Sequence, residues 1–186
     1  MSKIKIIETN IKGLVVLEPT IFGDERGYFL ETYNKKELEE WGIFVDFVQD
    51  NQSFSTKGVL RGLHFQKKFP QTKLVRVVTG EVFDVAVDLR KNSETFGKWF
   101  GIILSDKNKK QLLIPRGFAH GFLVLSDSAE FAYKVDDFYH PEDEGGIRFD
   151  DPQINIHWPN CDALIISEKD AKNPSLFEIL EKGLYL

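Results

Sequence analysis

Short runs of β-branched and aromatic residues, separated by turn residues, recur along this chain and constrain its fold more than any other feature. The clearest runs are residues 74–78 and 82–89, which flank Thr79-Gly80-Glu81 and predict a hairpin. Further runs with strand-like sequence are residues 11–18, 28–33, 44–47, 99–104, 111–114, 121–125 and 131–135. Many short strands of this kind predict a mainly antiparallel β-sandwich or β-barrel.

Helix is predicted in only two segments. Asn34 is placed to cap a helix over residues 35–41, with Glu37 as its capping-box partner. A second helix is expected at about 174–182, because Pro174 suits a first helical turn and the apolar residues after it recur at helical spacing. The fold expected from the pattern is therefore a mainly antiparallel β-barrel with a few short peripheral helices.

Composition narrows the class of protein. A length of 186 residues with 42% hydrophobic content suits one domain, spanning residues 1–186, with a well-filled core. The lone Cys161 excludes an internal disulfide, and no apolar run reaches signal-peptide length or the ~20 residues of a membrane span, so we expect a cytoplasmic protein without a membrane partner. A net charge of -5 and a pI of about 5.4 argue against a nucleic-acid partner.

Three polar residues fall on otherwise apolar, inward strand faces. His120 shares its parity with Phe118 and Phe122, and Tyr133 and Lys73 lie in similar alternation. Burying such groups without partners costs roughly 1–3 kcal/mol each, so a Lys, a His and a Tyr facing one interior indicate a site. Taken singly, each also has an ordinary explanation, as a packed core residue or, for Lys73, as a side chain that reaches solvent from a strand start.

The histidines raise a metal site as the rival interpretation. The chain has four, at His64, His120, His140 and His157. Metal sites in β-barrels of this size commonly use two His at i and i+2 on one strand with a nearby Glu, and this sequence has no such pair. The spacing therefore argues against a metal-dependent enzyme.

An anionic ligand would need a local cluster of positive charge, because the chain as a whole is acidic. Arg26, Arg61, Lys73 and Lys169 are the candidates. Arg is the better diphosphate ligand, because its planar fork matches phosphate oxygens in a bidentate way. Neither common Gly-rich phosphate loop is present, so side chains would have to hold the phosphates.

Several ordered motifs resemble one known family over residues 11 to about 170. They are FGDERG (22–27), FVQDN (47–51), VLRGLHFQ (59–66), KLVR (73–76), GEVFDVAVD (80–88), IPRGFAHGF (114–122), YK (133–134), DP (151–152) and WP (158–159). The chain is similar in these segments to the dTDP-4-dehydrorhamnose 3,5-epimerase family.

The resemblance implies a fold and an activity. The fold would be a cupin-like, jelly-roll type β-barrel in a homodimer whose N-terminal strands are exchanged, with no metal and no cofactor. The activity would be that of an isomerase of L-rhamnose biosynthesis, which converts dTDP-4-dehydro-6-deoxy-D-glucose to dTDP-4-dehydro-L-rhamnose by inverting C3 and C5 through an enolate. Alternatives are an epimerase of a related dTDP-4-keto-6-deoxy sugar that inverts only C3 or only C5, a metal-dependent cupin enzyme, and a sugar-nucleotide-binding module without activity.

The resemblance also implies four catalytic residues. His64 would remove the substrate proton, and Tyr133 would return one to the opposite face. Asp170 would hydrogen-bond the base and fix its tautomer. Lys73 would face the C4 oxygen, where negative charge develops.

Ten further positions would bind the substrate by the same resemblance: Arg26, Glu31, Gln49, Asp50, Asn51, Arg61, His120, Tyr139, Glu144 and Lys169. Arg26 and Glu31 would reach the site of the partner subunit. Tyr139 would stack near the thymine, although a core aromatic at a strand end is an equal interpretation of this residue.

One local feature is needed to reconcile these assignments. Simple alternation places Arg61 and His64 on opposite faces of one strand, yet both are expected at the substrate. A bulge at Gly62 would shift the parity between them and bring both to one face. We therefore predict an irregular strand at Gly62.

Overall fold

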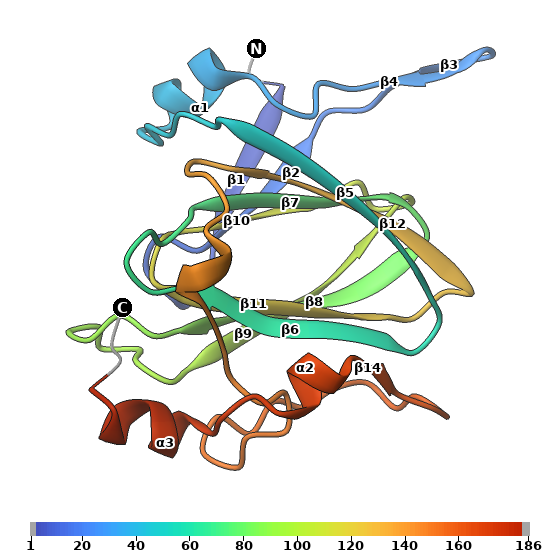
Figure 1. Cartoon of the computed structure of the whole chain (residues 1–186). Helices are drawn as coiled ribbons and strands as arrows, with labels where there is room; N and C mark the ends of the chain where they lie inside the picture. Colours follow the sequence, from blue (N-terminus) through green and yellow to red (C-terminus); the bar gives the residue numbers. More distant parts are fainter. Residues whose placement is uncertain (1–2, 184–186) are drawn as a thin grey trace.

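Two antiparallel sheets, packed face to face, form the body of the computed structural model, which describes residues 3–183 (Figure 1). The first sheet has the order β1 (Ile4–Glu8), β2 (Val15–Pro19), β10 (Gln111–Ile114), β7 (Lys73–Thr79), β12 (Ser128–Val135) and β5 (Gln49–Thr56). The second has the order β13 (Glu144–Gly146), β6 (Val59–Gln66), β11 (Phe118–Val124), β8 (Glu81–Asp88) and β9 (Trp99–Ser105), and β14 (Ile165–Ile166) pairs in parallel with β6. The mainly β prediction is confirmed, in the form of an open two-sheet barrel.

The core lies in layers between and outside the sheets. Val82 and Ala86 of β8 belong to the apolar cluster between the two sheets, which also contains the fully buried Phe131. The intervening residues of β8, such as Val85 and Val87, face the other way and pack against the C-terminal segment. The alternation of the sequence thus gives the second sheet two buried faces.

Short helices cover the outer faces. α1 (Lys35–Glu40) packs on the first sheet through Leu38, and α3 (Leu176–Glu181) packs on the second through Leu176 and Ile179. The Asn34 cap of α1 is present, because its side chain accepts from the backbone N–H of Glu37 at 3.3 Å. The predicted capping box is wrong, because the Glu37 carboxylate accepts instead from the N–H groups of Lys3 and Ile4 in the N-terminal strand region. Between β14 and α3 lies α2 (Glu168–Ala171), and a 3-10 turn η1 (Pro141–Asp143) precedes β13. Within residues 3–183 no helix is long and apolar enough to cross a membrane.

The C-terminal helix begins later than predicted. Ser175 is its N-cap and forms a full capping box with Glu178. Pro174 therefore precedes the helix instead of lying in its first turn. The capping side chain decides the boundary here, as the stronger local signal.

The hairpin predicted over residues 74–89 is wrong, although both strands form. β7 pairs with β10 and β12, whereas β8 pairs with β11 and β9, so the chain crosses from one sheet to the other at Gly80. Gly80 has φ +85°, and a Cβ there would lie 2.1 Å from the carbonyl oxygen of Ser128. The Gly-containing turn is thus a corner between sheets and does not reverse the chain within one sheet.

Other strand boundaries also differ from the prediction. β2 begins only at Val15, because Ile11 and Leu14 close a turn in which the N–H of Leu14 donates to the carbonyl of Ile11. Residues 44–47 form no strand, and the run predicted over 28–33 gives only the short β4 (Gly27–Phe29), paired with β3 (Phe22–Asp24). This β3–β4 hairpin projects from the body of the molecule (Figure 1).

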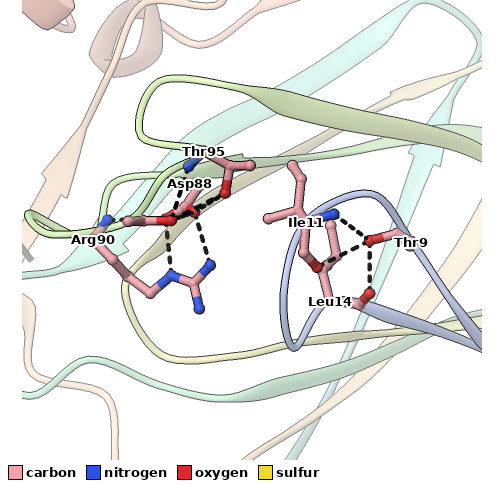
Figure 2. A network of polar contacts seen from close by, with 7 residues as sticks. Thr9, Ile11, Leu14, Asp88, Arg90 and Thr95 are labelled. Carbon is pink, nitrogen blue, oxygen red and sulfur yellow. Dashed lines mark hydrogen bonds and ion pairs between the residues drawn. The ribbon is translucent and has the colours of Figure 1, made fainter.

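A polar network closes one end of the two-sheet body. The buried Asp88 at the end of β8 accepts from the guanidinium of Arg90 at 2.8–2.9 Å and from the hydroxyls of Ser93 and Thr95. Figure 2 shows this network beside the turn in which the Thr9 hydroxyl donates to a backbone carbonyl. Every oxygen of Asp88 has a partner, so the network fixes the loop that connects β8 to β9.

Candidate active site

A cavity of about 550 Å³ lies between the sheets and gathers the residues predicted to be catalytic. His64 comes from β6, Lys73 from β7, Tyr133 from β12 and Asp170 from α2. Other lining residues, several of them predicted ligands, are Gln52, Ser53, Arg61, His120, Phe122, Phe131 and Lys169. Groups far apart in the sequence therefore meet at one concave surface.

The strand that carries Arg61 and His64 is irregular at Gly62, as predicted. His64 lies opposite His120 and Arg61 lies opposite Phe122, so β6 holds one residue more than its partner over this stretch. Gly62 has φ +121°, and a Cβ there would lie 2.6 Å from the Cα of Gly121. The Gly62–Leu63 peptide bond is cis. The extra residue shifts the parity, so that Arg61 and His64 line the same cavity.

His64 and Asp170 form a close pair. The distance from His64 Nε2 to Asp170 Oδ1 is 2.6 Å, and the other carboxylate oxygen accepts from the backbone N–H of Gly62 at 3.2 Å. Asp170 lies in the short α2, whose N-cap Ser167 accepts from the N–H of Asp170. The aspartate is thus held by its own helix and by the strand that carries the histidine.

The ionisation of Asp170 determines which nitrogen of His64 is available. Burial acts to raise the pKa of Asp170, but the hydrogen bond and charge of His64 and the N–H of Gly62 outweigh it and lower this pKa. An ionised carboxylate can only accept, so Nε2 carries the proton of the neutral imidazole. Nδ1 then keeps its lone pair and can take a proton from a ligand.

Lys73 is a partly buried cation without an ion pair to any residue in the part of the chain that the structure describes. Burial lowers the pKa of its ammonium group to about 8, although the negative charges of Asp84 and Glu144 oppose this effect. The group can therefore be charged near neutral pH while its hydrogen-bonding capacity is free. Such an ammonium group is suited to meet negative charge on a ligand.

A second imidazole–carboxylate pair lies in the wall of the cavity. His120 Nε2 is 2.9 Å from Oδ2 of Asp84, a residue that is fully buried. The other oxygen of Asp84, Oδ1, has no hydrogen-bond partner among the described residues. Asp84 was not among the predicted site residues, although its position between Val82 and Ala86 on the inward face of β8 is a sequence signal for a buried polar group.

Tyr133 completes the set of titratable groups. It follows the buried Phe131 on the inward face of β12, as its parity predicted. Burial raises the pKa of its phenol, and Glu144 adds to this effect while Arg61 opposes it. Tyr133 is therefore protonated at neutral pH and can act as a proton donor.

A chain of polar contacts forms the rim beside the cavity. The phenol of Tyr139 donates to Glu144 Oε2 at 2.7 Å, and Lys169 Nζ donates to the same oxygen at 2.5 Å. This hydrogen bond to Glu144 raises the pKa of Tyr139 to about 12. The alternative interpretation of Tyr139 as a core aromatic is wrong, because half of its surface (50%) is exposed.

The predicted ligands on β5 lie at the edge of the first sheet and do not line the cavity. Gln49 Nε2 donates to Asn51 Oδ1 at 2.8 Å, and Asp50 pairs with Lys134. Their neighbours Gln52 and Ser53, which the sequence analysis did not single out, do line it. Strand parity alone does not mark these two small polar residues as ligands.

Arg26 and Glu31 lie away from the cavity of their own chain. Arg26 is at the turn of the β3–β4 hairpin, which projects from the body of the molecule in Figure 1. Its guanidinium pairs with Asp24. Glu31 pairs with Lys3 at 3.0 Å. Among the residues that the structure describes, no group of three or more His, Cys, Asp or Glu side chains is arranged to hold a metal ion.

A family model, curated relatives and solved structures that are similar to this chain all belong to one family of epimerases. A model of the dTDP-4-dehydrorhamnose 3,5-epimerase family matches residues 8–178. The dTDP-4-dehydrorhamnose 3,5-epimerase of Methanothermobacter thermautotrophicus is 56% identical over 172 residues, which are 91% of this chain and 93% of that protein. The Escherichia coli K12 enzyme of the same name is 54% identical over 181 residues, 96% of this chain and 98% of its own length.

A solved structure is similar over the same extent. It is the crystal structure of dTDP-6-deoxy-D-glucose-3,5-epimerase from Legionella pneumophila in complex with dTDP-4-keto-L-rhamnose. Its TM-score to this chain is 0.94 at 54% sequence identity, covering 97% of both chains.

Proposed function

The chain belongs to the dTDP-4-dehydrorhamnose 3,5-epimerase family, and we propose that His64, Asp170, Tyr133 and Lys73 carry out its epimerisation in the cavity between the sheets. The enzyme is an isomerase that converts dTDP-4-dehydro-6-deoxy-D-glucose to dTDP-4-dehydro-L-rhamnose. The observation that carries the assignment of residues is the 2.6 Å contact between His64 and Asp170 in a cavity that also holds Tyr133 and Lys73.

The substrate supplies most of the reactivity. Its 4-ketone acidifies the protons on both neighbouring carbons, so a single base can remove the protons at C3 and C5 in two separate steps. We assign this step to Nδ1 of His64, the nitrogen that does not contact Asp170. Asp170 stabilises the imidazolium that forms, because it is an ionised carboxylate at hydrogen-bond distance.

Each proton removal leaves an enolate whose negative charge is concentrated on the C4 oxygen. Lys73 is the group suited to stabilise it, since its ammonium has no competing ion pair among the described residues. The hydrogen bond from His120 to Asp84 orients a second ring in the same wall. Fixed donors of this kind stabilise a transition state most where water is excluded.

Inversion requires a proton from the face opposite the base. Tyr133 lines the cavity from the first sheet, whereas His64 lies on the second. A phenol whose pKa is raised by burial stays protonated until a carbanion is present, and it can then donate. His64 as base and Tyr133 as acid together account for inversion at either carbon.

The nucleotide is assigned to the rim. Arg61 and Lys169 line the cavity and supply the positive charge that a diphosphate requires. The exposed Tyr139, held by Glu144, offers a ring on which thymine can stack. Gln49, Asp50 and Asn51 remain proposed ligands at the nearby sheet edge.

A homodimer would complete the site. Arg26 lies on a hairpin that projects from its own chain, and several aromatic residues on and beside this hairpin are exposed, such as Phe22 at 49% and Phe29 at 63%. Exchange of this N-terminal region would bury these rings and bring Arg26 and Glu31 to the partner's substrate. A cytoplasmic location is supported by the single cysteine, which can form no internal disulfide.

Isotope exchange tests the activity and separates double from single epimerisation. The enzyme is incubated with dTDP-4-keto-6-deoxyglucose in D2O, and deuterium at each carbon is counted by NMR. Inversion of both centres requires deuterium at C3 and at C5. Label at only one of them would identify a single-centre epimerase, and no label at either would contradict the function.

A further inference from the structure

We propose that Gln66 is a positioning residue that fixes the backbone on both sides of Tyr139 and so holds this ring ready for the nucleotide base; this rests on the proposed function. Gln66 is the last residue of β6 and is 5% exposed. It has no part in the proton transfers described above. Its buried amide is instead fully used in contacts with two loops.

The amide of Gln66 binds the two backbone groups that flank Tyr139. Its Nε2 donates to the carbonyl of Phe138 at 3.3 Å, and its Oε1 accepts from the N–H of His140 at 2.7 Å. One side chain therefore fixes the segment on both sides of the tyrosine. Its Nε2 also donates to the carbonyl of Phe69 at 2.7 Å, which joins this segment to the loop that follows β6.

A second contact joins the same two loops. The rings of Phe69 and His140 are stacked, with centroids 4.3 Å apart and planes at 23°. The N–H groups of Lys68 and Phe69 both donate to the buried carboxylate of Asp143, in the turn that follows the aromatic segment. The loop after β6 is thus a fixed support against which Gln66 holds residues 138–140.

The side chains of Phe138 and Tyr139 themselves contribute little packing, so the backbone contacts of Gln66, together with the stacked ring of His140, determine where the Tyr139 ring points. Phe138 and Tyr139 are 60% and 50% exposed. The Tyr139 phenol donates to Glu144, which pairs directly with Gln66 across the ladder between β13 and β6. Gln66 therefore acts on Tyr139 in two ways. It binds the backbone on both sides of the tyrosine, and it pairs along the strand with Glu144, which accepts the hydrogen bond of the tyrosine hydroxyl. An exposed ring on an unconstrained loop would lose conformational entropy when a base stacks on it. The hydrogen bonds of Gln66 order the loop before the ligand binds, so this entropy is not lost on binding.

The test is a Gln66→Met variant of the full enzyme, which keeps the side-chain length and removes all three hydrogen bonds. We expect KM to rise about tenfold with kcat within about threefold of wild type, because base–aromatic stacking contributes roughly five- to a hundredfold in affinity. The Kd for dTDP should rise as KM does. The Kd for inorganic pyrophosphate, which has no base, should not change.

Gln71→Met is the matched control. The Gln71 amide also donates to a carbonyl of this segment, that of Asp137, but one peptide further from Tyr139. This variant should keep the wild-type KM. An equal rise in KM for Gln71→Met, or equal losses of affinity for dTDP and pyrophosphate in Gln66→Met, would overturn the proposal.

Two further variants cover the cases in which Gln66→Met does not fold or the proposed function fails. Phe69→Leu removes only the stacked ring and should raise the Kd for dTDP by about two- to threefold. In a Tyr139→Ala background, Gln66→Met should add little to the Kd for dTDP, since the ring it positions is gone; additive losses would contradict the proposal. These binding measurements need no turnover, so a wild-type enzyme that binds dTDP but does not epimerise would contradict the function and leave the role of Gln66 testable.

Discussion

Asp84 and Asp88 lie on the same strand, β8, and both are fully buried, but their surroundings differ. Asp88 accepts hydrogen bonds from Arg90, Ser93 and Thr95, and every oxygen is satisfied (Figure 2). Asp84 has one hydrogen bond, to His120, and its second oxygen has no partner among the described residues. One strand thus carries a carboxylate that is fully paired and one that is not.

This difference indicates that Asp88 has a structural role, whereas Asp84 belongs to the wall of the candidate active site. Burial would raise the pKa of Asp88, but its bonds to Arg90, Ser93 and Thr95 outweigh burial and lower this pKa to about 2. Asp88 therefore keeps its charge at any ordinary pH and can fix a loop without taking part in proton transfer. Beside Asp84, the cavity retains Lys73, which has no ion pair among the described residues, and the Nδ1 atoms of His64 and His120, whose contacts with carboxylates are made through Nε2. Unsatisfied groups are costly in a core, and they mark where a ligand completes the pairing.

A purely structural role for Asp88 would be contradicted if its substitution changed catalysis more than stability. Asp88→Ala should lower the free energy of unfolding by about 3–5 kcal/mol, because it leaves the guanidinium of Arg90 without its buried partner. The folded fraction should keep its kcat. Denaturant unfolding followed by circular dichroism measures the loss.

A matched control for Asp88→Ala is Asp150→Ala. It removes an Arg148–Asp150 pair whose distance is 2.6 Å, against 2.8 Å for Arg90 and Asp88, but whose side chains are 47% and 46% exposed. This variant should cost less than about 1 kcal/mol. Equal losses at Asp88 and Asp150 would mean that burial of the network contributes nothing to the fold.

Lys73→Met should have the opposite effect to Asp88→Ala, with a large loss of kcat and no loss of stability. We expect kcat to fall about 10²- to 10³-fold, the loss typical of removing one donor that stabilises an oxyanion. The free energy of unfolding should stay the same or increase, since an apolar side chain replaces a partly buried charge that has no ion pair among the described residues. Steady-state kinetics and denaturant unfolding on one preparation measure both, and Lys134→Met, at a lysine paired with Asp50, is the control that should leave kcat unchanged. A destabilised Lys73→Met enzyme with normal kcat would contradict the assignment.

The pH dependence of an Asp84→Asn variant tests whether Asp84, unlike Asp88, acts on the catalytic groups. Burial lowers the pKa of Lys73 to about 8, so activity that needs its charge should be lost as the pH rises through this value. Besides Lys73 and Asp84, the titratable and charged groups that line the cavity or face it from adjacent elements are His64, His120, Tyr133, Glu144, Asp170, Arg61 and Lys169. Removing the charge of Asp84 disfavours the protonated lysine, so the alkaline limb of kcat/KM should move to lower pH and activity at pH 8 should fall about three- to tenfold. An unchanged limb would show that Asp84 does not act on Lys73.

Much of the fold and site follows from the sequence where a local rule applies. Alternation on β12 and β11 predicted the inward faces of Tyr133 and His120, and a parity conflict between Arg61 and His64 predicted the bulge at Gly62. Each of these depends on neighbours along one strand. The motif that resembles a known family identified Asp170, which pattern alone could not orient.

The rest depends on contacts that a single segment does not determine. The turn at Gly80 reads as a hairpin, and only the pairing of β7 and β8 with different neighbours makes it a corner between sheets. In the sequence, Asp84 is a single acidic residue in an apolar strand, and only the structure shows that it is hydrogen-bonded to His120. The role of Gln66 could not be predicted, because the two backbone groups that it binds beside Tyr139 belong to a loop distant in the sequence.

The most direct test of the account is proton exchange at C3 and C5 in D2O, compared between His64→Asn and Tyr133→Phe. Removal of the base should slow exchange at both carbons by about 10²- to 10⁴-fold. Removal of the opposing acid should leave exchange measurable while inversion is slowed, because His64 can return deuterium to the face from which it took the proton. Exchange at the wild-type rate in His64→Asn would contradict the account, and so would a Tyr133→Phe enzyme that inverts both carbons at the wild-type rate.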